Sequence, residues 1–187
     1  MNDKLDELAK TFAQSVTRRQ ALKKFGLSLA LGCATLCLAT PLRAGQQVPF
    51  KGNFSFTIVL ATPIDATHVL FDVDVHVQAT QLGKAQGPGR FILDLAALAY
   101  VGEAAWAAAN GDEVSSTFAG QFVPTDTPGL LENVEIFEIV GGTGRFEGAT
   151  GAGIGGGQVE VDAAGTLMPL FPAPFVGTIS SPGSLKK

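Results

Sequence analysis

The strongest constraint on the fold is an alternation of apolar and polar residues with a period of two. In residues 71–79 every second residue is phenylalanine, valine or alanine, and the residues between them are Asp72, Asp74, His76 and Gln78. Successive side chains of a β-strand point to opposite faces, so this pattern predicts a strand with one buried face. We expect further strands at 54–60, 103–109, 113–123, 133–140 and 175–180, separated by glycine, proline and asparagine. The chain is therefore predicted to be all-β.

A hairpin is predicted where Asn110-Gly111 joins residues 103–109 to residues 113–123. Both residues tolerate the positive φ that the two central positions of a tight hairpin turn need. The preceding segment, 92–109, contains eight alanines and favours helix by local propensity. Gly102 interrupts that segment, and the hairpin needs a strand on each side. We expect two strands here, and a helix is the alternative.

The N-terminal region carries a targeting pattern. Thr17-Arg18-Arg19-Gln20-Ala21-Leu22-Lys23 precedes an uncharged apolar run of 14 residues, 25–38. The paired Arg18 and Arg19 resemble the signal read by the bacterial twin-arginine translocase, which is the partner expected during export. We expect cleavage after Ala44 and a periplasmic or secreted product. An uncleaved anchor is the main alternative, although the run is shorter than the roughly 20 residues that span a bilayer. Lipidation at Cys33 is a further alternative.

Cleavage would leave residues 45–187, a length that suits one β-barrel domain. This part has six basic and 14 acidic residues, a formal net charge of −8. A surface of that sign repels nucleic acid and anionic lipid, so no nucleic-acid partner is expected. Both cysteines, Cys33 and Cys37, lie in the signal. The domain therefore has no disulfide and depends on packing for its stability.

Nine glycines lie between residues 141 and 157. The spacing Gly151-x-Gly153-x-x-Gly156 formally matches a dinucleotide-binding loop, but strand alternation resumes at 155–161 where such a loop needs a helix. No nucleotide or other cofactor is therefore expected. On a strand, alternate glycines from 151 to 157 leave one face without side chains. Aromatic rings or a ligand must fill that space, and we expect packing more than a cavity.

Three segments resemble a known family. Residues 139–151 read Ile-Val-Gly-Gly-Thr-Gly-Arg-Phe-Glu-Gly-Ala-Thr-Gly, residues 107–112 read Ala-Ala-Ala-Asn-Gly-Asp, and residues 175–180 read Phe-Val-Gly-Thr-Ile-Ser. They are similar to small exported bacterial proteins of the allene oxide cyclase and dirigent barrel superfamily. The resemblance implies an eight-stranded antiparallel β-barrel, often a homo-oligomer, with a lumen able to hold a hydrophobic small molecule. The shared motifs are turn and strand signatures, so no catalytic residue is carried over.

Candidate ligand-binding residues are Tyr100, Trp106 and Glu138. Glu138 shares a strand face with Val134, Ile136 and Val140, so it is the carboxylate expected in the lumen if that face points inward. Burial there would disfavour its ionised form. Glu135 lies on the opposite face of the strand, so the two glutamates are not expected to act as an acid/base pair.

Other candidate sites are weaker. Asp72, Asp74 and His76 share a face and could bind a divalent metal, but a solvated outer face is the favoured interpretation, and no metal is expected. No serine nucleophile motif is present. Residues 166–175 contain three prolines among apolar residues and are expected to form an ordered loop or lid over one mouth of the barrel.

Three functions stay open. The favoured one is a non-catalytic barrel that binds a hydrophobic small molecule or lipid. The second is a cyclase, isomerase or dirigent-like enzyme that confines a reactive intermediate, which an inward carboxylate or tyrosine would favour. The third is a structural or self-associating barrel, which a solid core would favour. Fold alone does not choose among them.

Overall fold

The computed structural model describes residues 46–161, 167–170 and 172–180. These residues form nine β-strands and one short 3₁₀ helix. No helix among them is long and apolar enough to cross a bilayer. The elements are β1 (Gln47–Pro63), β2 (His68–Ala79), β3 (Gly83–Asp94), β4 (Ala99–Ala108), β5 (Glu113–Pro124), β6 (Leu130–Gly142), η1 (Gly144–Phe146), β7 (Gly151–Val161), β8 (Leu167–Leu170) and β9 (Ala173–Ser180).

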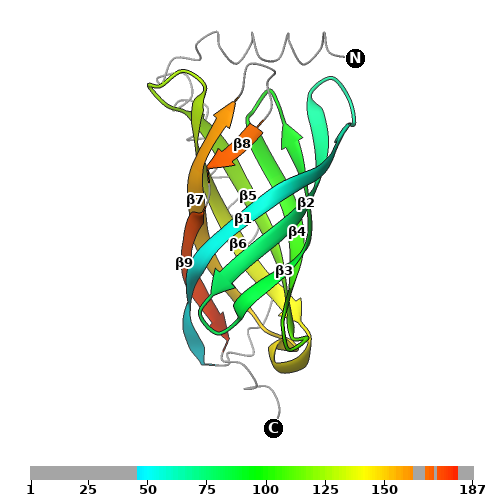
Figure 1. The fold of residues 1–187 in the computed structure, drawn as a ribbon, viewed down its shortest axis with the longest axis vertical. Helices are drawn as coiled ribbons and strands as arrows, with labels where there is room; N and C mark the ends of the chain where they lie inside the picture. The colour runs from blue at the N-terminus through cyan, green and yellow to red at the C-terminus, as the bar shows by residue number, and fades with distance from the viewer. Residues whose placement is uncertain (1–45, 162–166, 171, 181–187) are drawn as a thin grey trace, which may run out of the picture.

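The strands close into an eight-stranded antiparallel barrel. Each of β1 to β6 pairs with the next strand in sequence, β6 pairs with β7, β7 with β9, and β9 returns to β1. Figure 1 shows the strands inclined to the long axis, as closure of a twisted sheet requires. The predicted all-β fold and the predicted strand count are both confirmed.

The ninth strand, β8, is the first part of the last barrel strand. β8 and β9 pair in succession with the same edge of β7, which uses its other edge for β6. In β7, Gln158 pairs with Leu170 and Gly155 pairs with Phe175. Between these two pairs, β7 has three residue steps and the last strand has five. Two extra residues therefore interrupt the last strand, as in a β-bulge. The predicted lid is wrong for the described part of residues 166–175, because its backbone is paired within the sheet; Thr166 and Phe171 lie outside the described residues.

The alanine-rich segment is not a helix. Its residues form the end of β3, a short loop and β4. The loop is stabilised by Asp94, whose Oδ1 accepts hydrogen bonds from the backbone N–H groups of Ala96 (2.8 Å) and Ala97 (3.1 Å). Every second residue of β4 from Tyr100 to Ala108 points inward, and burial of that face outweighs the helix propensity of alanine.

The β4–β5 hairpin is present, but its turn differs from the expected one. Gly111 has a φ of +84°, whereas Asn110 is not among the non-glycine residues with positive φ. The Gly111 N–H donates to the Ala108 carbonyl, and the Ala108 N–H donates to the Asp112 carbonyl. Only one left-handed residue is needed because the connection is longer than a two-residue turn.

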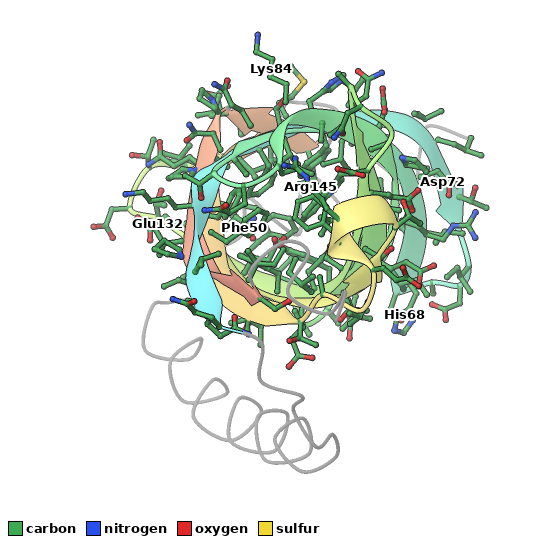
Figure 2. All side chains as sticks on the ribbon, turned by 90° about the horizontal axis from the view of Figure 1, so that it is seen from below. Phe50, His68, Asp72, Lys84, Glu132 and Arg145 are labelled. Atoms are coloured by element: carbon green, nitrogen blue, oxygen red, sulfur yellow. The ribbon has the colours of Figure 1, made fainter. Side chains whose placement is uncertain are left out.

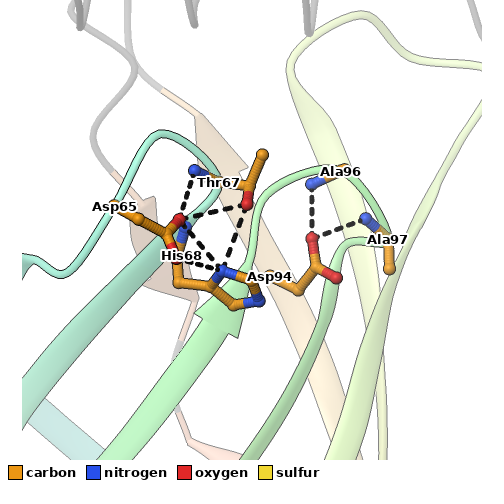
Figure 3. Close-up of polar contacts among 6 residues, drawn as sticks. All are labelled: Asp65, Thr67, His68, Asp94, Ala96 and Ala97. Carbon is orange, nitrogen blue, oxygen red and sulfur yellow. Dashed lines mark hydrogen bonds and ion pairs between the residues drawn. The ribbon is translucent and has the colours of Figure 1, made fainter.

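Two neighbouring loops meet at one end of the barrel (Figure 3). Between β1 and β2, Asp65 Oδ1 accepts hydrogen bonds from the N–H groups of Thr67 (2.7 Å) and His68 (2.9 Å). The bond from the Thr67 N–H foremost, and then the hydrogen bond with the His68 side chain, lower the pKa of Asp65 to about 2. The Leu95 N–H donates to the Thr67 carbonyl and ties the β3–β4 loop to this turn.

The barrel interior is filled mainly by aromatic side chains. Phe50 is fully buried, and its ring lies 5.3 Å from that of Phe175 and 6.4 Å from that of Phe137. Figure 2 views the barrel from below, with Asp72, Lys84 and Glu132 on the outside of its wall. Phe71 and Phe91 stack at 4.9 Å further along the lumen. Inward aromatic residues on neighbouring strands thus form one continuous core.

Candidate functional site

The candidate site is a cavity of about 70 Å³ inside the barrel. Its wall is mostly aromatic and aliphatic and includes Phe91, Phe122 and Val75. Five polar side chains also line it: Tyr100, Trp106, Ser116, Asn133 and Glu135. An apolar enclosure with a few polar groups is the usual form of a small-molecule site.

The glycines of β7 let aromatic rings lie directly against its backbone. A Cβ added at Gly153 would come within 2.4 Å of Phe137 Cζ, and one at Gly155 within 3.4 Å of Phe54 Cε1. The packing expected for this glycine face is confirmed at both positions. The rings do not fill the lumen completely, because Gly157 lines the remaining cavity.

A hydrogen-bonded cluster lies on the wall of this cavity. Tyr100 Oη is 2.8 Å from Glu135 Oε2 and 2.7 Å from Asn133 Oδ1. Tyr100 belongs to β4 and the other two residues to β6, so the contact crosses the intervening strand β5. The side chain of Tyr100 can cross β5 because its partner there is Gly120, whose own partner on β6 is Glu135. Gly120 has no side chain, and a Cβ at this position would lie 2.3 Å from Tyr100 Oη.

Burial raises the pKa of both Glu135 and Tyr100. Loss of solvation raises the pKa of Glu135 to about 7, and the hydrogen bond from Tyr100 opposes that rise. The pKa of Tyr100 also lies well above its ordinary value, because of burial first and then the Glu135 carboxylate. A phenol has one proton to donate. When Glu135 is protonated, it can donate to the phenol oxygen while Tyr100 donates to Asn133.

Two further polar groups on the cavity wall have no hydrogen-bond partner among the described residues. They are Trp106 Nε1 and Ser116 Oγ. Both side chains are buried, with 8% and 2% of their residue surface exposed. Two residues of the cavity wall, on β4 and β5, thus carry buried polar atoms without a partner, in addition to the Tyr100 cluster.

The structure places two of the three predicted ligand-binding residues in the lumen. Tyr100 and Trp106 line the cavity, whereas the expectation for Glu138 is wrong. Glu138 is exposed on the outer wall together with Val134 (56% exposed) and Ile136 (42%). The inward residues of β6 are those that alternate with Glu138, and they include Asn133, Glu135 and Phe137.

Sequence reasoning missed Glu135 because both faces of β6 carry apolar residues. Val134, Ile136 and Val140 mark one face, and Leu131, Phe137 and Ile139 mark the other. The face with Leu131, Phe137 and Ile139 has the larger side chains. Its leucine and phenylalanine were the available indication that this face, which includes Glu135, points inward. Ser116 and Asn133 were missed as well, since an isolated polar residue in a strand pattern carries no such signal.

The face of β2 that carries Asp72, Asp74 and His76 points outward, as expected. Asp72 Oδ1 accepts a hydrogen bond of 2.8 Å from Arg90 Nε on β3, and Asp74 Oδ2 lies 3.5 Å from His76 Nε2. Within the described ranges, no group of three or more histidine, cysteine, aspartate or glutamate residues could hold a metal ion.

No protein-family model matches the chain, and no curated protein matches it either. The resemblance to the allene oxide cyclase and dirigent superfamily thus rests on the sequence motifs and stays a prediction.

Proposed function

We propose that this protein is an exported β-barrel that binds a small, mostly apolar molecule in its lumen. The observation that carries the proposal is the cavity in the barrel, with aromatic walls and several polar groups. Those polar groups would orient the ligand, and the aromatic rings would supply most of the apolar contact.

The volume of the cavity limits the ligand. At about 70 Å³ it is smaller than the roughly 150 Å³ apolar cavity that binds benzene in an engineered protein. A compound with a few non-hydrogen atoms fits without rearrangement. A lipid chain would require aromatic rings such as Phe91 and Phe122 to turn aside.

Export forms part of the proposal and rests on the sequence. Arg18, Arg19 and the apolar run lie outside the described residues, so the twin-arginine signal and cleavage after Ala44 stay predictions. The absence of cysteine from residues 45–187 agrees with a domain that folds before export and gains no disulfide afterwards.

A second candidate function is proton-transfer catalysis, as in a cyclase or isomerase. Glu135 favours it, because a carboxyl group with a pKa of about 7 is present in both acid and base forms near neutral pH. Its contact with Tyr100 gives a path for moving a proton within the lumen. A substrate with an acidic C–H bond next to a carbonyl group would suit this pair.

Native mass spectrometry of the protein from a bacterial host tests binding and export together. We expect a denatured mass that begins at Gly45 and a native mass larger by one non-covalent ligand. A bare chain in both spectra would count against constitutive binding and favour the structural barrel.

For the catalytic candidate, exchange of ligand hydrogen for deuterium in D₂O should be faster with the wild type than with Glu135→Gln. Equal rates would argue against catalysis by Glu135.

A further inference from the structure

The unsatisfied groups Trp106 Nε1 and Ser116 Oγ point to the chemistry of the ligand. Buried side-chain polar groups nearly always have a hydrogen-bond partner, because an unpaired one loses its hydration without compensation. In the described part of the chain only one other buried side-chain atom lacks a partner, Thr150 Oγ1, and Thr150 does not line the cavity.

The two groups lie close to each other on the barrel wall. Trp106 on β4 pairs with Val114 on β5, and Ser116 is two residues further along the same inward face. Diagonal neighbours of this kind lie about 7–8 Å apart at the backbone, within reach of a large aromatic side chain. One ligand atom could therefore accept hydrogen bonds from the indole N–H and the serine O–H.

The charge of the wall excludes an anionic ligand. The cavity lining among the described residues contains no lysine, arginine or histidine, and its one ionisable acid is Glu135. A carboxylate placed there would lose its hydration without gaining a cationic partner. It would also repel the ionised form of Glu135.

We propose that the lumen selects a neutral ligand with a hydrogen-bond acceptor, such as a ketone or ester carbonyl oxygen. That oxygen accepts hydrogen bonds from Trp106 Nε1–H and Ser116 Oγ–H, and the remainder of the molecule contacts the aromatic wall. The inference rests on the proposed binding function and adds the ligand class.

Three small molecules of nearly equal shape test this inference: butanone, 2-methyl-1-butene and propionate. The first has a neutral carbonyl, the second replaces its oxygen with CH₂, and the third carries a charge. The readout is ¹H–¹⁵N NMR of the purified protein, in which the single tryptophan gives one indole N–H signal. We expect butanone to bind about 5- to 10-fold more tightly than the alkene, as one or two neutral hydrogen bonds would give. It should also move the indole proton signal downfield, and propionate should bind at least about 10-fold more weakly than butanone.

Variants at two adjacent serines complete the test. Ser116→Ala should reduce the affinity for butanone severalfold and leave that for the alkene unchanged. Ser115→Ala is the matched control, since Ser115 lies on the other face of β5 and should change neither affinity. Equal binding of butanone and the alkene with an unmoved indole signal would overturn the inference and leave the proposed function intact. Tighter binding of propionate would also overturn it, and binding of none of the three would overturn both.

Discussion

At the scale of single residues, Glu135 illustrates how neighbours set the chemistry of a side chain. It is flanked across the sheet by Gly120 on β5 and Gly155 on β7, so neither adjacent residue covers it. Tyr100 reaches it over Gly120, and the barrel shields it from bulk water. The carboxyl group is thus enclosed by aromatic rings and accessible from the cavity, which explains its raised pKa.

The raised pKa of Glu135 predicts that stability falls as pH rises. Between the ordinary value of 4.5 and the folded value of about 7, the folded state binds more protons than the unfolded state. The contribution of Glu135 to the free energy of unfolding should therefore be fully present below about pH 4.5 and fall by on the order of 3 kcal/mol towards pH 8. Urea unfolding at pH 5 and pH 8 measures this change.

Substitution separates this contribution from those of other groups. Glu135→Gln should remove most of the loss, whereas Glu138→Gln, on the outer face of the same strand, should keep the wild-type behaviour. A wild-type loss that persists in Glu135→Gln would contradict the assignment.

Gly120 should be more sensitive to substitution than Gly155. A Cβ at Gly120 would meet Tyr100 Oη at 2.3 Å, so Gly120→Ala must displace the ring and break its hydrogen bond to Glu135. We expect a loss of about 1–3 kcal/mol of unfolding free energy. Gly155→Ala is the control, because its nearest contact is 3.3 Å and a small adjustment suffices. Similar losses in urea unfolding for the two variants would argue against this role of Gly120.

At the scale of elements, turns and burial together decide between strand and helix. The β3–β4 connection is short and stabilised by Asp94, and the β4–β5 connection contains a left-handed glycine. Both turns force the alanine-rich residues between them to run back along the sheet. Alanine then serves as a small inward side chain beside the large Tyr100 and Trp106.

Gly111 should be required for its backbone conformation alone. Its φ is +84°, and an added Cβ would meet nothing within 4 Å. Gly111→Ala should therefore cost about 1–2 kcal/mol through backbone strain, measured by urea unfolding. Gly111→Asn should recover much of that loss, because asparagine tolerates the left-handed region. Equal losses for the two variants would indicate a different cause.

At the scale of the whole molecule, the barrel combines a packed aromatic interior with an acidic sequence. Residues 45–187 carry a formal net charge of −8 and no cysteine. Their stability therefore depends on ring packing and on closure of the sheet. Closure gives β1 to β7 and β9 two neighbours each, whereas β8 pairs only with β7 among the described residues. A domain without cysteine can fold in a reducing compartment, as the proposed export route requires.

Export should depend on the paired arginines. Replacing both, as Arg18→Lys with Arg19→Lys, keeps the positive charge and should abolish transport by the twin-arginine route. Fractionation of a bacterial host should then find uncleaved precursor inside the cell. Lys4→Arg, outside the motif, should leave export unchanged. Normal export of the double variant would indicate another route.

Period-two alternation and turn residues are local properties, so the residues alone predicted the all-β class, the hairpin at Gly111 and most of the strands. They did not predict β8, or β3 before residue 92. The alternation shows which residues share a face of a strand. It does not show which of the two faces points into the barrel. On β6 both faces are apolar, so only closure of the barrel turned Glu135 inward and Glu138 outward. Tertiary structure alone also brought Tyr100 to Glu135, since the two residues lie 35 positions apart and meet across a glycine on a third strand.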